Sequence, residues 1–182
     1  MRLLSHHPIR IYQAVLTMLT LPGAAALSAF SRAKLLLTLQ QHNAAVTGVA
    51  ARFVHFADVG AALDLEQQQL LDRLLRYGPT QPPQQEAASD PVVELLVVPR
   101  PGTISPWSSK ATDIARQCGL QVLRIERGVQ YAWQTKKSLS TEQEQLVLAA
   151  LHDRMTEAVI SDINEASALY QSLPDRPFVR IP

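Results

Sequence analysis

The sequence has little of what several classes of protein require. Its 182 residues include one cysteine, Cys118, which excludes an internal disulfide framework and a cysteine-based zinc cluster. The 17 Lys and Arg residues nearly balance the 16 Asp and Glu residues, so the chain lacks the basic excess of a dedicated nucleic-acid-binding protein. Charged residues make up 18% and hydrophobic residues 47%, a globular rather than disordered composition. We therefore expect a cytoplasmic globular protein of one domain or two small ones, with its chemistry still open.

The sequence also lacks the residue spacings of a metal or nucleophile site. No two histidines are separated as in His-x3-His, so no metal site is expected. Cys118 falls on the same predicted helical face as Trp107 and Ile114, which predicts a buried and inert thiol. We accordingly predict no catalytic residue in this chain.

No apolar run is long enough for a transmembrane helix. The longest candidate, residues 11–21, is short and contains polar residues. Basic residues precede it and three alanines follow it, which is also the outline of a secretory signal. The alternative is that residues 1–17 are a disordered extension or the product of a start placed too early, before a natural start at Met18. A secreted domain is thus one hypothesis, but we prefer a protein that contacts no membrane.

Hydrophobic periodicity predicts alternating helices and strands. Ser28, Asp64 and Ser105 stand where N-cap residues are expected. The apolar faces of the first two helices are expected to include Phe30 and Leu65. Helices are predicted at 28–42, 65–77, 106–118, 141–152 and 163–173. Strands are predicted at 46–56, at 92–98 with both faces buried, at 122–133 with a bulge at Gly128, and at 155–160.

The predicted elements follow the same order on both sides of a proline-rich linker, residues 79–91. This repetition suggests a diverged internal duplication, with halves at 18–78 and 92–162. The element order alone favours a parallel α/β sheet.

The most informative segment is PRPGTISPWSSKATD at 99–113, which passes from a predicted strand through a loop into a helix. A helix N-terminus suits anionic ligands, and Arg100 and Lys110 add positive charge. A phosphate-binding loop needs a glycine directly before its lysine, whereas Ser109 stands there. Three interpretations remain open: a rigid capped loop, an interface or substrate-edge loop, and a nucleotide site. The candidate residues are Arg100, Thr103, Ser105, Ser108, Ser109, Lys110, Thr112 and Asp113.

Several stretches of the sequence together resemble one family. They are PRPGTISPWSSKATDIA at 99–115, LSAF at 27–30, VHFAD at 54–58, LLRYGP at 74–79, IERG at 125–128 and LHDRMTE at 151–157. From about Leu19 to Asp162 the chain closely resembles the N-terminal domain of the large, single-chain phosphoribosylformylglycinamidine synthase. In that family the domain looks like two fused copies of the small PurS-type subunit. The resemblance therefore implies an α+β fold of two related PurS-like subdomains, with strands packed against helices.

The resemblance also implies a place in de novo purine biosynthesis. The family's enzyme is a glutamine-dependent ligase that converts formylglycinamide ribonucleotide, glutamine, ATP and water into formylglycinamidine ribonucleotide, glutamate, ADP and phosphate. ATP and Mg²⁺ are implied for the synthetase domain of that enzyme, and a Cys-His-Glu set for its glutaminase domain. Residues 163–182 resemble the start of the linker toward these later domains. None of the family's catalytic residues can be placed on this chain, so loop 100–113 is expected to be architectural or to lie at the substrate edge.

Two hypotheses follow. The first is an accessory domain that docks the glutaminase and synthetase domains and lines the substrate region, while being inactive and binding no cofactor by itself. The second is a free-standing, non-catalytic interaction module left by a truncated gene. The reading frame directly downstream distinguishes them.

Overall fold

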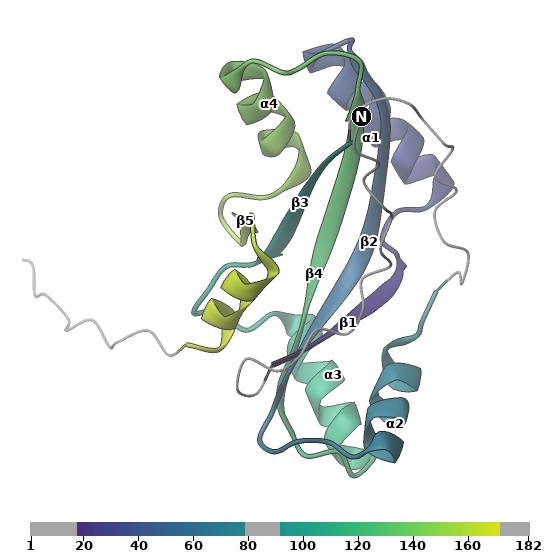
Figure 1. Ribbon diagram of the computed structural model, residues 1–182, viewed down its shortest axis with the longest axis vertical. Helices are drawn as coiled ribbons and strands as arrows, with labels where there is room; N and C mark the ends of the chain where they lie inside the picture. The colour runs from purple at the N-terminus through teal and green to yellow at the C-terminus, as the bar shows by residue number, and fades with distance from the viewer. Residues whose placement is uncertain (1–17, 79–91, 172–182) are drawn as a thin grey trace, which may run out of the picture.

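The computed structural model describes residues 18–78 and 92–171 (Figure 1). The expectations for residues 1–17, for linker 79–91 and for the tail after residue 171 lie outside these ranges. The strands are β1 (Met18–Ala25), β2 (Val46–Val59), β3 (Val92–Pro99), β4 (Val122–Thr135) and β5 (Glu157–Ile160). The helices are α1 (Ala29–His42), α2 (Leu65–Leu75), α3 (Pro106–Gln117), α4 (Thr141–Leu151) and the 3-10 helix η1 (Ile163–Tyr170).

The described strands form one sheet in the order β1-β2-β4-β3-β5, and each neighbouring pair is antiparallel. The predicted α+β fold is confirmed, whereas the parallel sheet favoured by element order alone is wrong. The physical reason is the length of the central strands. Strand β2 is long enough to lie beside two consecutive elements: β1 pairs with its second half, from Arg52 to Asp58, and α1 continues beside its first half. The chain then turns back into β2, which is therefore antiparallel to β1.

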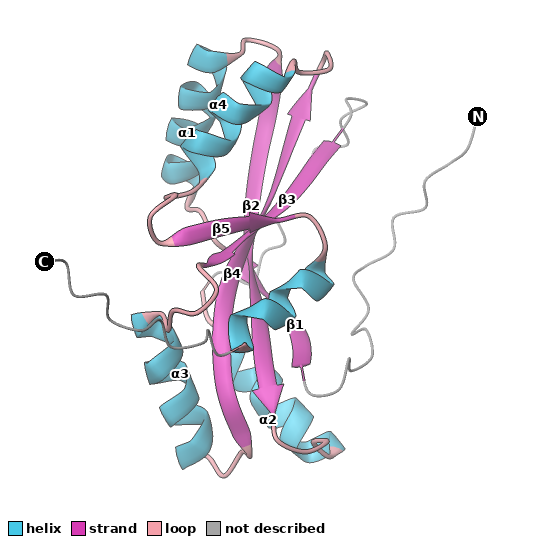
Figure 2. Cartoon of the chain, turned by 90° about the vertical axis from the view of Figure 1, so that its left-hand side faces the viewer, coloured by secondary structure: helices cyan, strands magenta, loops and turns pink. Residues whose placement is uncertain are grey.

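The arrangement has approximate two-fold symmetry about the β2–β4 pair. These strands pair from Val46 opposite Thr135 to Val59 opposite Val122, and the register shifts once near each end. Helices α1 and α4 cover one end of the sheet, and α2 and α3 cover the other (Figure 1, Figure 2). Each helix pair combines one helix from each half of the chain, which is consistent with a duplication. The division into two subdomains itself stays a prediction.

The four α-helices pack on one face of the sheet and η1 on the other. Val49 and Ala57 lie an even number of residues apart on β2 and so share a face, and they belong to the cores beneath the two helix pairs. Val54 and Phe56 point to the opposite face and pack against Ala166 and Leu169 of η1. Within the described ranges, no helix combines the length and apolar composition that crossing a bilayer requires.

The predicted helices form, but three of their expected core residues lie on the surface. Phe30 of α1 is 78% exposed and Leu65 of α2 is 69% exposed. On α3 the buried positions are small residues, so Ile114, expected in the core, is instead exposed. The physical reason is that small side chains let a helix approach the sheet closely, which a search for large apolar residues does not detect. The expectation that 92–98 is buried on both faces is likewise wrong at its start, because Val92 and Val93 are exposed.

Strand β1 is an element that the sequence pattern did not indicate. It contains Pro22 and Gly23, both unfavourable inside a strand. Both are tolerated because β1 is an edge strand, and its register with β2 shifts between Pro22 and Ala25.

The predicted bulge at Gly128 is wrong. The β2–β4 register continues without a shift through the pair of Val54 and Gly128. The glycine instead allows β3 to lie close, because a Cβ at residue 128 would be 2.8 Å from the carbonyl oxygen of Val97.

Replacing Gly128 with alanine is therefore expected to lower the free energy of unfolding by about 1–3 kcal/mol through overpacking. Urea denaturation followed by circular dichroism measures this loss. The matched control is Gly60→Ala, because a Cβ there meets only the side chain of Leu123, at 3.7 Å. The control is expected to change stability by less than about 0.5 kcal/mol. Equal losses in the two variants would contradict the close-approach explanation.

Candidate functional site at the β3–α3 loop

The loop between β3 and α3 is folded into a compact turn. Arg100 donates its backbone N–H to the carbonyl oxygen of Thr156, at 2.9 Å. Both the backbone N–H and the hydroxyl of Thr103 donate to the carbonyl oxygen of Arg100, at 3.1 and 2.6 Å. Gly102 has a φ of 82°, which favours glycine. The turn then leads into Ser105, the N-cap of α3.

A buried ion pair on β4 forms hydrogen bonds to this loop. Glu126 is fully buried and pairs with Arg124. The carboxylate of Glu126 also accepts the hydroxyl of Ser105 at 2.9 Å and its backbone N–H at 3.2 Å. Arg124 donates in addition to the carbonyl oxygens of Thr103 and Leu169. A single buried pair thus connects the loop, β4 and η1.

The N-terminus of α3 already has an anion beside it. Ser105 caps the helix by accepting the backbone N–H of Ser108, at 3.0 Å, while it donates its own hydroxyl to Glu126. A phosphate at this position would face the Glu126 carboxylate. The geometry therefore favours the rigid-loop and interface interpretations over a nucleotide site.

The predicted site residues divide into two groups. Ser105, Ser108 and Thr112 face inward: Ser108 and Thr112 are buried, and the hydroxyl of Thr112 accepts the backbone N–H of Ile125 at 2.9 Å. Ser105 and Thr112 position the loop and the helix through hydrogen bonds, whereas the buried hydroxyl of Ser108 has no hydrogen-bond partner among the described residues. The exposed group is Arg100, Thr103, Ser109, Lys110 and Asp113. In the described part of the chain, neither the Arg100 side chain nor the Lys110 side chain forms a hydrogen bond or an ion pair.

The structure also gathers a cluster that the site prediction missed. His55 of β2, Tyr77 after α2, Trp107 of α3 and Arg127 of β4 lie together beside Phe53. His55 Nε2 lies 2.8 Å from the Tyr77 hydroxyl, and its ring stacks on Trp107 with the centroids 5.5 Å apart. The motifs VHFAD, LLRYGP, SPW and IERG each contribute one of these residues, so the sequence did contain a signal. Separately they indicate only family resemblance; the fold brings them together.

Comparison with known families decides the identity of the chain. Residues 52–170 match the family described as formylglycinamide ribonucleotide amidotransferase N-terminal. The chain belongs to this family. The match runs from β2 to the end of η1, so it includes the loop, the ion pair and the aromatic cluster.

Membership confirms the resemblance to the N-terminal domain of phosphoribosylformylglycinamidine synthase and places the chain in purine biosynthesis. The domain is part of an amidotransferase, and in such a multidomain enzyme it acts alongside other domains of the same chain. Among the described residues of this amidotransferase domain, no group of three or more His, Cys, Asp or Glu side chains is arranged to hold a metal ion.

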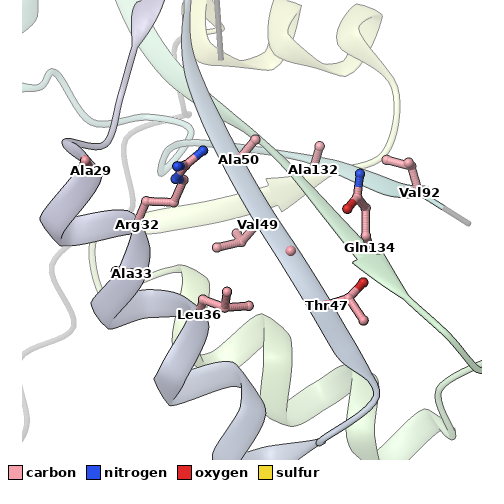
Figure 3. A pocket seen from close by; sticks show the side chains of 11 residues that line it. Ala29, Arg32, Ala33, Leu36, Thr47, Val49, Ala50, Val92, Ala132 and Gln134 are labelled. Carbon is pink, nitrogen blue, oxygen red and sulfur yellow. The ribbon is translucent and has the colours of Figure 1, made fainter. Parts of the chain in front are cut away.

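A hollow of about 260 Å³ in the amidotransferase domain is lined by α1, by the first half of β2, by the start of β3 and by the end of β4 (Figure 3). Small side chains line much of it, including Ala33 and Ala50, while Arg32 and Gln134 supply polar groups. The two-fold arrangement relates the first half of β2 to the first half of β4, where the Arg124–Glu126 pair lies. The lining residues include no carboxylate, histidine or cysteine, so we assign this hollow no chemistry.

The expectation for Cys118 is wrong, because its side chain is exposed. The buried face of α3 consists of Ser108, Thr112 and Ala115, which is rotated by one residue from the face of Trp107 and Cys118. Cys118 follows the last residue of α3 as its C-cap and points to solvent. It therefore contributes neither to the core nor to the site.

Proposed function

We propose that this chain is the accessory domain that docks the glutaminase and synthetase domains of phosphoribosylformylglycinamidine synthase and lines its substrate region. The enzyme's reaction joins ATP hydrolysis to the transfer of glutamine nitrogen onto formylglycinamide ribonucleotide. ATP and Mg²⁺ are assigned to the synthetase domain, and the chain by itself is expected to form no product. Its place of action is proposed to be the cytoplasm.

One observation carries the proposal: a loop with exposed charged side chains is held rigid by a buried ion pair. Burying an ion pair is costly, and removing one partner leaves an uncompensated charge. Here the pair bonds directly to the backbone of Thr103 and Ser105. Arg100, Lys110 and Asp113 are consequently presented from a fixed support, which suits contacts with a facing domain or with the edge of an anionic substrate.

In the full-length enzyme, Arg100→Ala is expected to lower the rate of ATP-dependent amidation, or its coupling to glutamine hydrolysis, by at least about tenfold. Such a factor corresponds to about 1.4 kcal/mol of transition-state or positioning energy. Intrinsic glutamine hydrolysis should persist, because its residues lie in another domain. Product formation and glutamate release are measured side by side.

The matched control is Arg73→Ala on α2, which removes an exposed positive charge outside the loop. It should leave both rates unchanged. If Arg100→Ala has parental rates and the same glutamate-to-product ratio, the loop is only scaffold. Failure of the separately expressed synthetase–glutaminase portion to capture this chain would favour the free-standing interaction module instead.

A further inference from the structure

Arg127 is held between two aromatic rings. Its guanidinium carbon lies 4.3 Å from the centroid of the Phe53 ring and 4.8 Å from that of Trp107. One guanidinium nitrogen donates to the Tyr77 hydroxyl at 3.1 Å. Two cation–π contacts and one hydrogen bond therefore hold the Arg127 guanidinium in place.

The charge of Arg127 has no counter-ion in the described part of the chain. The ion pairs found there are Arg76 with Asp72 and Arg124 with Glu126. A guanidinium has five N–H donors, and the hydrogen bond to Tyr77 uses one. By contrast, Arg124 has a counter-ion in Glu126 and also donates to two carbonyl oxygens. Arg127 thus keeps a net positive charge and unused donors.

The neighbouring groups do not neutralise this charge. Burial and the nearby Arg127 guanidinium lower the pKa of His55 to about 4, so the imidazole is neutral at physiological pH. The Tyr77 hydroxyl accepts a hydrogen bond from Arg127 and lies 2.8 Å from His55 Nε2, while the buried Nδ1 of His55 has no hydrogen-bond partner among the described residues. Lys110 is exposed and stands one helical turn from Trp107, on the same side of α3, which adds a second positive charge nearby.

We propose that Arg127 forms, with its aromatic clamp, a binding site for an anion with two oxygens, namely a carboxylate or a phosphate. A planar guanidinium matches such groups with two parallel hydrogen bonds. The clamp is already in position, so binding loses little side-chain entropy. Arg127 and Phe53 lie outside loop 100–113, so the proposal stands whether or not Arg100 affects amidation.

The test follows the side-chain N–H resonances of Arg127 and Trp107 by NMR in the 182-residue chain. Sodium phosphate and sodium acetate are titrated separately, with sodium chloride keeping the ionic strength constant. Saturable shifts at both residues are expected with at least one anion. Tighter binding of phosphate indicates a phosphorylated small molecule as the natural ligand, and tighter binding of acetate indicates a carboxylate.

Arg127→Gln is expected to weaken anion binding at least about tenfold. Arg127→Lys is expected to weaken anion binding as well, because the ammonium group lacks the planar pair of donors. The matched control is Arg52→Gln, which lies on the opposite face of β2 and bonds to Gln130. It should bind like the parent. The indole resonance of buried Trp133 verifies folding in each variant. Absence of saturable shifts in the parent, equal shifts with chloride, or parental affinity in both Arg127 variants would overturn the proposal.

Discussion

Glu126→Ala is expected to lower the free energy of unfolding by about 3–5 kcal/mol, because it leaves a largely buried Arg124 without its counter-ion. The substitution also removes the carboxylate that accepts both bonds from Ser105. The N-cap of α3 and the turn before it therefore lose their support together. Urea denaturation followed by circular dichroism provides the measurement.

The matched control is Glu94→Ala, on β3 of the same sheet face. Glu94 is exposed and accepts a hydrogen bond from Gln130 at 3.1 Å, so its loss should cost less than about 0.5 kcal/mol. The double variant Arg124→Met with Glu126→Leu is expected to lose less unfolding free energy than the sum of the losses in Arg124→Met and Glu126→Leu made separately. The reason is that no unpaired charge remains in the double variant. Additive costs would show that the two residues act independently and would contradict the paired-charge explanation.

Acidification from pH 6.5 to pH 4 is expected to remove about 3 kcal/mol of stability through His55 alone. Its pKa is lowered from 6.5 to about 4 in the folded protein, first by burial and second by Arg127. Over this range the unfolded state binds a proton that the folded state does not. Stability therefore falls as the pH falls, by up to about 1.4 kcal/mol per unit.

The variant His55→Phe isolates this contribution, because the ring remains and the titration does not. The difference in unfolding free energy between parent and variant should change by about 3 kcal/mol between the two pH values. His42→Gln, at the exposed end of α1, serves as the control and should follow the parent. A constant difference between parent and His55→Phe would show that His55 is not held in its neutral form.

Local elements were largely predictable from the sequence because local interactions define them. Ser28, Asp64 and Ser105 all cap helices as predicted, since each side chain accepts a backbone N–H within three residues of itself. The segment PRPGTISPWSSKATD at 99–113 likewise located the loop, and the family match confirms the resemblance. These features need no knowledge of distant contacts.

The candidate site was only half predictable. The loop itself could be found, but its support could not, because Ser105 and Glu126 are 21 residues apart and neither suggests the other. The same holds for the aromatic clamp, since Arg127 and Tyr77 are separated by 50 residues. Only pairing of β2 with β4 brings His55 opposite Arg127.

By itself, the sequence determined the family, the positions of most helices and strands, and the loop that carries the exposed charges. Tertiary structure alone decided the antiparallel order of the strands, the exposure of Cys118 and the existence of the Arg127 clamp. The physical reason is that strand pairing and helix approach depend on contacts between distant segments. A pattern of apolar residues shows that a face will be buried, but the geometry of its partner decides which face that is.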